Sequence, residues 1–209
     1  MKKQAKKHGF TLAETLITLA IIGVCAAMLI TTIKNINPNE ASNLVMARKA
    51  VGTFTEATRQ VLLFNSQTKK MDNLASGGTA CASAQCLTQL YGKYLQISRM
   101  SATNPTPDAQ LGGTYYGELI DGLLFGIEYN KGCVLHEGET VQVLPPDEGM
   151  VSEVVVSGAC AMIYYDVNGV KGPNRVGTDR FVIPVRKSGV KMSAKATAQS
   201  NDDGPGGIF

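Results

Sequence analysis

An apolar run near the N-terminus is too long for an ordinary core helix. Residues 10–33 read FTLAETLITLAIIGVCAAMLITTI, and Glu14 is their only charged residue. A helix of this length rises about 36 Å at ~1.5 Å per residue, which is enough to cross the hydrocarbon core of a bilayer. The pattern therefore predicts a transmembrane helix at residues 10–33.

A second helical pattern follows the apolar run. Apolar residues recur at three- and four-residue steps from residue 41 to residue 65, which is typical of an amphipathic helix. Pro38 lies between the two segments and lacks a backbone N–H, so we expect a kink or a local break there. Residues 34–65 are therefore predicted to continue the first helix and to pack one face on a globular head.

The second half of the chain changes to strand-like segments. Tyr116–Ile120 and Leu123–Tyr129 flank Asp121-Gly122, which predicts a β-hairpin. Other predicted strands are Cys133–His136, Ala159–Val167 and Arg180–Arg186, with a weaker one at Val154–Val156. The segment CLTQLYGKYLQI, residues 86–97, predicts a short helix before the strands.

Together these elements predict an α+β fold, in which a long N-terminal helix packs on a small antiparallel β-sheet head. The head is predicted at residues 66–192. Residues 193–209 are small, polar and glycine-rich, so we expect a flexible tail. A chain of 209 residues has room for one globular domain and this extension.

Positive charge is concentrated at the N-terminus. The first nine residues hold four lysines and no acidic residue, so the rest of the chain is slightly acidic despite a formal net charge of +3. The chain therefore gives no indication of a basic surface for nucleic acid. Lysines before an apolar run predict a cytoplasmic N-terminus, which places the head on the other side of the membrane.

The order of features at the N-terminus is a lysine-rich leader, Gly9, Phe10 and an apolar run that contains Glu14. A secretory signal peptide places its cleavage site after the apolar stretch, whereas this run continues into a long helical pattern. The segment resembles the class III signal of type IV pilins and type II secretion pseudopilins. The resemblance implies that a prepilin peptidase removes residues 1–9 by cutting after Gly9 and N-methylates Phe10.

The same resemblance implies a role for Glu14. Its position is that of the glutamate five residues into a mature pilin, and a carboxylate buried among packed helices needs a cation. The α-amine of Phe10 on a neighbouring subunit is the expected partner. The long helix followed by antiparallel strands also matches the pilin architecture.

The resemblance implies a structural subunit of a pilus (fimbrium) or of a type II secretion pseudopilus. The subunit would reside in the bacterial inner membrane with a periplasmic head, and would reach the periplasm or cell surface in a filament. Its implied partners are other copies of itself, related pilins, prepilin peptidase and the inner-membrane assembly machinery. The alternative is a membrane-tethered periplasmic binding module that uses the helix only as an anchor.

Four of the five cysteines form two local groups. Cys81 and Cys86 lie in a loop of small residues, and Cys133 and Cys160 flank a predicted strand–loop–strand segment. An even set of cysteines beyond a membrane span indicates disulfides in an oxidising compartment, so we predict the pairs Cys81–Cys86 and Cys133–Cys160. The alternative is four reduced, buried cysteines. Cys25 lies in the apolar run, where a free cysteine behaves as a small hydrophobic residue.

Residues 166–179 are the most site-like segment outside the N-terminus. Asp166, Asn168, Asn174 and Asp179 supply side-chain oxygens on a glycine-rich loop, which is the ligand type that Ca²⁺ prefers. The loop resembles the aspartate-rich calcium loops of some pseudopilins, although the spacing is not a strict match. The alternative is a folded turn in which these side chains bond to the backbone.

Motifs of catalysis are missing from the sequence. The phosphate-binding G-x-x-x-x-G-K-[ST], the zinc-binding H-E-x-x-H and the hydrolase G-x-S-x-G do not occur. His136 is interpreted as an ordinary strand residue, since no nucleophile is placed beside it. We therefore expect no enzymatic activity and no cofactor, apart from the candidate structural Ca²⁺.

Overall fold

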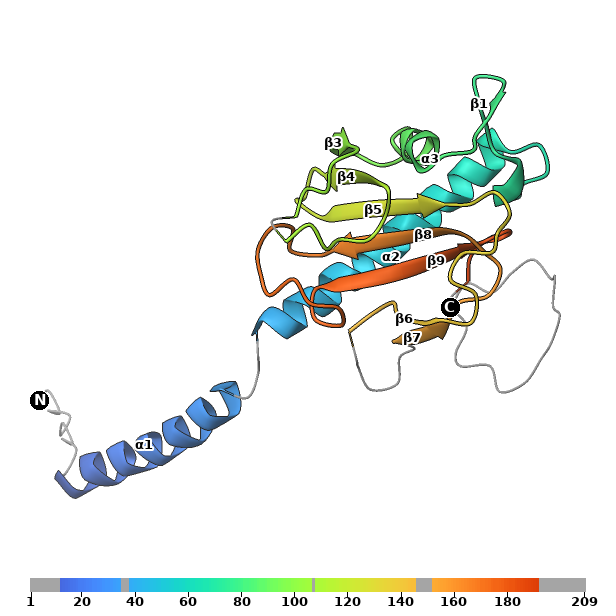
Figure 1. Ribbon diagram of the computed structural model, residues 1–209. Helices are drawn as coiled ribbons and strands as arrows, with labels where there is room; N and C mark the ends of the chain where they lie inside the picture. The colour runs from blue at the N-terminus through green and yellow to red at the C-terminus, as the bar shows by residue number, and fades with distance from the viewer. Residues whose placement is uncertain (1–11, 35–37, 107, 146–151, 192–209) are drawn as a thin grey trace, which may run out of the picture. The chain divides into compact units, whose positions relative to one another are not determined.

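The computed structural model describes residues 12–34, 38–106, 108–145 and 152–191. The chain consists of two structural units, residues 1–41 and residues 42–209. The first contains helix α1, Leu12–Lys34, and the second contains most of helix α2, Pro38–Asn65, and all the strands. The architecture is α+β with antiparallel sheets, as the sequence predicts (Figure 1).

Helix α1 covers the described part of the apolar run. The hydroxyl groups of Thr15 and Thr18 donate hydrogen bonds to the carbonyl oxygens of Leu12 and Thr15, at 2.8 and 2.9 Å. These polar side chains are therefore satisfied within the helix and do not need an outside partner. Within the residues that the structure describes, no helix meets the length and apolarity that crossing a membrane requires.

Helix α2 begins at Pro38, where a missing N–H costs nothing because the first turn has no partner for it. It ends at Asn65, where the amphipathic pattern predicts its end. One face is buried at three- and four-residue steps, and this face consists of Ala47, Ala50, Phe54, Ala57 and Val61. The small residues on this face allow the helix to lie close to the sheet.

The main sheet has six strands, and every neighbouring pair is antiparallel. Helix α2 crosses one face of it (Figure 1). In spatial order the strands are β10 (Gly189–Val190), β9 (Arg180–Arg186), β8 (Ala159–Asp166), β5 (Leu124–Tyr129), β4 (Tyr115–Leu119) and β3 (Ile97–Ser101).

Smaller elements complete the head. Strands β1 and β2 form one two-stranded sheet, and β6 and β7 form another between β5 and β8 in the sequence. The bounds are η1 Met71–Asn73, β1 Ala75–Ser76, β2 Thr79–Ala80, α3 Ala84–Tyr91, β6 Thr140–Gln142 and β7 Glu153–Val155.

The core between α2 and the sheet is centred on Phe54. Its ring lies 5.3 Å from that of Phe125 on β5, 6.3 Å from that of Tyr91 on α3 and 6.5 Å from that of Tyr165 on β8, between ring centroids. The buried hydroxyl of Tyr91 is paired with that of Thr58 at 2.7 Å. Aromatic side chains from α2, α3 and the sheet thus fix the head as one packed body.

Loops cover part of the opposite face of the sheet. The segment that leads into β4 lies so close to β5 that a Cβ added at Gly126 would collide with the carbonyl oxygen of Gly112. Nearby, Leu111, Tyr116 and Leu124 form a second buried apolar cluster, against which Tyr164 packs. Glycine at position 126 is therefore required by close backbone approach.

The predicted strands at Ala159–Val167 and Arg180–Arg186 and the predicted hairpin are confirmed by β8, β9 and the pairing of β4 with β5. The hairpin turn has three residues, Ile120–Gly122, because Leu119 and Leu123 still pair across it. Gly122 closes this turn with a φ of 88°, a conformation that glycine adopts freely.

One predicted strand is wrong, and the predicted short helix is confirmed but is shorter than its segment. Cys133–His136 is a loop and not a strand, because Cys133 and His136 have φ values of 58° and 50°, which extended backbone excludes. Only Leu135 of this segment forms a β-bridge, to Ala159. The predicted helix at residues 86–97 ends at Tyr91, and β3 begins at Ile97.

Candidate functional site

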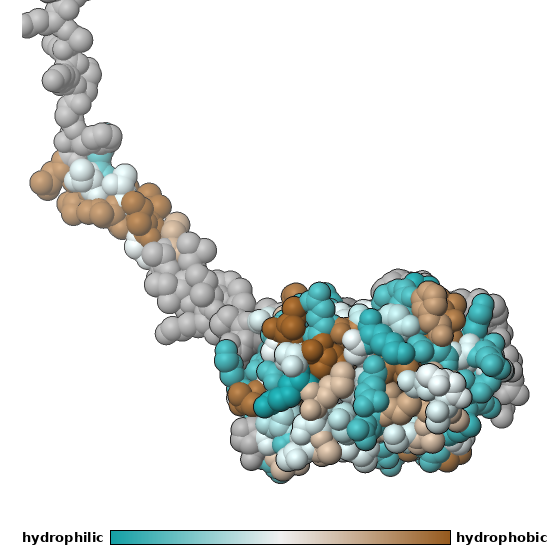
Figure 2. Space-filling model, turned by 90° about the horizontal axis from the view of Figure 1, so that it is seen from above, coloured by the Kyte–Doolittle hydropathy of each residue, from teal (hydrophilic) through white to brown (hydrophobic). Residues whose placement is uncertain are grey.

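The surface of α1 is the first candidate for function. Every side chain from Leu12 to Cys25 is exposed, including Leu12 at 80% and Ile22 at 62%. Figure 2 shows this part of the helix as a mostly hydrophobic surface. A helix that is apolar on all sides is stable only where lipid or other helices cover it. The α1 surface is therefore suited to a membrane or to packing with other helices.

Glu14 is the acidic residue in the first turn of α1. Its side chain is exposed, and the N-terminal end of a helix dipole favours a negative charge at this position. The predicted processing residues Gly9 and Phe10 lie outside the described residues. The structure thus places the carboxylate in the first turn of an apolar helix.

The structure contains the disulfides Cys81–Cys86 and Cys133–Cys160, the two pairs that the sequence predicts. The first links the end of β2 to α3, whose N-terminus is capped by Ser83 through a 3.2 Å bond from the Cys86 N–H. The second links the loop after β5 to β8. Of the described cysteines, Cys25 on α1 is free and exposed.

The predicted calcium residues lie together between β8 and β9. The Asp179 carboxylate accepts hydrogen bonds from the backbone N–H of Asn174 at 2.8 Å and from the Asn168 side-chain amide at 3.2 Å. It also accepts from the Arg175 N–H at 2.7 Å, and Asp166 accepts from the Asn168 N–H at 3.3 Å. Backbone and amide groups of the loop thus occupy the carboxylate oxygens.

Asp166 has a further partner that the sequence did not predict. The Arg180 guanidinium donates from Nε to Asp166 at 2.9 Å, and Asp166 is fully buried. Burial is the largest influence on this carboxyl and raises its pKa to about 6, even though the bond from Arg180 acts in the opposite direction. Over the described ranges, no group of three histidine, cysteine, aspartate or glutamate residues could hold a metal ion. These hydrogen bonds are those of a folded turn, and calcium binding by the loop stays a prediction.

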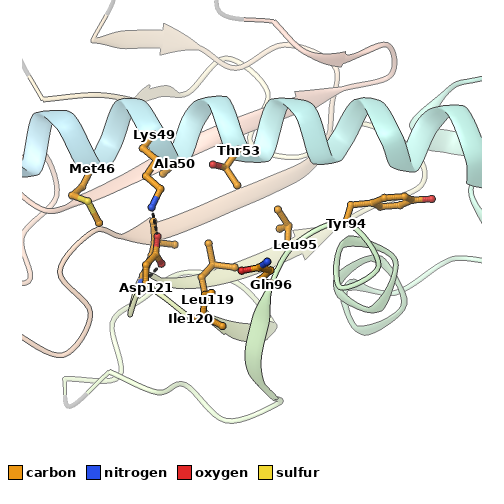
Figure 3. Close-up of a pocket in the computed structure, with 11 residues that line it drawn as sticks. Met46, Lys49, Ala50, Thr53, Tyr94, Leu95, Gln96, Leu119, Ile120 and Asp121 are labelled. Carbon is orange, nitrogen blue, oxygen red and sulfur yellow. Dashed lines mark hydrogen bonds and ion pairs between the residues drawn. The ribbon is translucent and has the colours of Figure 1, made fainter.

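A groove of about 360 Å³ lies on the head between α2 and the β4–β5 turn (Figure 3). At its edge the Lys49 ammonium forms an ion pair with the Asp121 carboxylate at 2.8 Å. The lining residues are otherwise apolar or neutral and include no histidine, cysteine or serine.

Comparison with known proteins identifies the N-terminal segment. The family described as the prokaryotic N-terminal methylation motif matches residues 4–30, a range that includes Gly9, Phe10 and Glu14. This motif is the class III prepilin signal of type IV pilins and pseudopilins, so the resemblance seen in the sequence is confirmed. It points to a structural protein with a membrane-anchored, periplasmic or surface location. No curated protein and no solved structure matches the chain.

Proposed function

We propose that this chain is the precursor of a structural subunit of a type IV pilus or of a secretion pseudopilus. A prepilin peptidase cuts it after Gly9 and methylates the new N-terminal Phe10. The observation that carries the proposal is the methylation motif at residues 4–30. The apolar surface of α1 supports it, because a helix of this kind is stable where lipid or other helices cover it.

Before assembly, residues 10–33 cross the inner membrane with the N-terminus in the cytoplasm. The lysine-rich leader favours that orientation, and Glu14 lies near enough to the start of the run to reach the headgroup region. The head then lies in the periplasm, where conditions favour the two disulfides.

During assembly, the α1 helices of several copies exchange lipid contacts for contacts with one another. The Phe10 ammonium loses water in this step, and burial of a lone charge is costly unless it is paired. Glu14 of a neighbouring copy supplies the partner and sets the axial position of one subunit against the next. The chain polymerises with itself or with related pilins.

Intact-mass measurement of the membrane-extracted protein, coexpressed with a prepilin peptidase, tests the proposal directly. The expected mature protein lacks Met1–Gly9 and carries one added methyl group. A Gly9→Leu variant serves as the control, because a bulky residue at the cleavage site should leave the leader attached, whereas Gly9→Ala should be cleaved in part. A wild-type protein that keeps its leader would contradict the proposal and favour a simple membrane anchor.

A further inference from the structure

The loop between β5 and β6, residues 130–139, contacts strand β8 and the segment before it at several points. The Cys133–Cys160 disulfide is one of them, and the Leu135 N–H donates to the carbonyl oxygen of Ala159 at 3.1 Å. The Gly138 N–H donates to the carbonyl oxygen of Val156, which lies between β7 and β8, at 2.9 Å. The apolar side chain of Leu135 packs on a cluster formed by Val156, Ala159 and Met162.

The side chain of His136 adds a polar attachment to the sheet. Its Nε2 lies 3.0 Å from a carboxylate oxygen of Glu128 on β5, and its Nδ1 lies 2.9 Å from a carboxylate oxygen of Glu139 in the same loop. The Tyr164 hydroxyl, on β8, lies 3.2 Å from both Nε2 and the Glu128 carboxylate. These three are the titratable groups that face the ring from β5, from β8 and from the loop itself.

This arrangement fits a charged imidazole. A neutral ring has one N–H, so in either tautomer one carboxylate would face a nitrogen lone pair, whereas the imidazolium donates to both carboxylates. Tyr164 can then donate its single proton to Glu128. Burial raises the pKa of the Tyr164 phenol, so this hydroxyl keeps its proton while His136 titrates.

We propose that His136 is a pH-dependent clasp, which holds the 130–139 loop on the sheet when the imidazole is protonated and releases it when the proton is lost. The disulfide limits the released loop to a local opening. Loss of the proton removes one N–H donor and leaves a carboxylate against a lone pair. The backbone N–H groups of Leu135 and Gly138, which attach the loop to Ala159 and Val156, lie close enough to report this change.

The direction of the pH effect follows from the same contacts. The hydrogen bond to Glu128, with a smaller one to Glu139, raises the pKa of His136 above its ordinary value of 6.5. When the pKa of a group is raised in the folded state, its protonation stabilises the fold. This stabilisation is complete below the ordinary pKa and is lost as the pH rises through the pKa of the folded state. The loop is therefore closed below the ordinary pKa of histidine, and it opens as the pH rises through the raised pKa of the folded protein.

Two-dimensional NMR of the full chain in detergent micelles tests the clasp. The His136 ring is followed between about pH 5 and pH 9, and His136→Gln assigns its signal against that of His8, the other histidine. The expected midpoint lies above ~6.5, the ordinary value for histidine. The backbone amide signals of Leu135 and Gly138 should shift with the same midpoint.

Two variants separate the clasp from a general effect of pH. Glu128→Gln removes the carboxylate at Nε2 and should lower the midpoint by about one pH unit, with the loop amides following it. Glu118→Gln on β4 is the matched control, since Glu118 pairs with Arg99 and should leave the midpoint unchanged. A His136 midpoint at or below the ordinary value, or loop amides that do not follow the ring, would overturn the proposal.

Discussion

Arg180, at the start of β9, forms a double hydrogen bond with Asp108, which lies 72 residues earlier in the chain. Its Nη1 and Nη2 donate to the two carboxylate oxygens at 2.7 and 2.8 Å. Because Nε also donates to the buried Asp166, one guanidinium joins the loop before β4 to the end of β8 and the start of β9. The arginine itself is only 5% exposed.

This junction predicts that Arg180→Lys destabilises the head. A lysine ammonium cannot match the planar fork of three bonds, and it leaves a buried carboxyl without its partner. Loss of one partner from a buried pair costs about 3 kcal/mol, so the melting temperature should fall by several degrees. Thermal unfolding, monitored by circular dichroism, measures the change in melting temperature. As a control, Arg59→Lys in the exposed pair with Glu56 should leave the melting temperature nearly unchanged.

Asp166 predicts a particular dependence of stability on pH. Its pKa is raised from 3.8 to about 6 in the folded protein, chiefly by burial. Between about pH 4 and pH 6 the folded state therefore holds a proton that the unfolded state has lost, so this group makes stability fall as the pH rises. Asp166→Asn should remove that fall, as melting temperatures at pH 4, 5, 6 and 7 would reveal. Parallel curves for the wild type and the variant would contradict the prediction.

The sequence predicted those parts of the fold that depend on local patterns. The short apolar run within Arg180–Arg186 and the end of α2 at Asn65 are properties of short segments, and both were predicted at the observed residues. The left-handed backbone at His136 was not predictable, because a disulfide and contacts to distant strands stabilise it. Strand β3 was missed because its sequence, ISRMS, is largely polar, and none of its five residues is buried.

The candidate sites show the same difference between features that depend on adjacent residues and features that depend on distant contacts. The N-terminal signal could be predicted, since adjacent residues carry it as a linear motif. The loop from Asp166 to Asp179 was singled out for its oxygen-bearing side chains, but nothing in the local pattern indicated Arg180 as the partner of Asp166. The contact between Asp108 and Arg180 could not be predicted either, because it depends on how the loop before β4 folds back over the sheet.

The calcium prediction for residues 166–179 can be tested by removing metal. A calcium ion would have to displace Arg180 from Asp166 and the backbone N–H groups from Asp179, so we expect the same melting temperature in calcium and in EDTA. Differential scanning calorimetry in the two buffers measures it. A higher melting temperature in calcium, lost in Asp166→Ala, would instead establish the metal site by mass action.

A pair of glycines predicts opposite effects of the same substitution. Gly126→Ala should destabilise the head by about 1–3 kcal/mol, because the added Cβ meets the Gly112 carbonyl oxygen and the Tyr116 ring. Gly52→Ala on the exposed face of α2 meets no atom within 4 Å and should stabilise the helix by about 0.5–1 kcal/mol. Thermal unfolding of both variants checks the signs. A neutral Gly126→Ala would mean that the loop before β4 can move away from the sheet.

The function rests on the expectation that Glu14 acts in assembly and not in insertion or folding. Insertion depends on the apolar run and the lysine-rich leader, and Glu14→Ala leaves both intact while removing a charge that is costly in lipid. The head contains the core around Phe54, which this substitution does not alter. The variant should therefore be processed, reside in the membrane and melt like the wild type.

Filament yield is the property that should change. Without Glu14, the Phe10 ammonium enters the packed helical core with no anionic partner, so each added subunit bears the cost of a buried, unpaired charge. Glu14→Gln keeps the shape and can accept a hydrogen bond, so its yield should lie between those of Glu14→Ala and the wild type. Shear fractionation with immunoblotting of filaments and membranes measures the yield of the wild type and of both variants. Glu56→Ala, on the exposed face of α2, controls for the loss of a carboxylate elsewhere in the chain. Normal filaments from Glu14→Ala would show that this carboxylate does not set the position between subunits, and would favour a helix that serves only as an anchor.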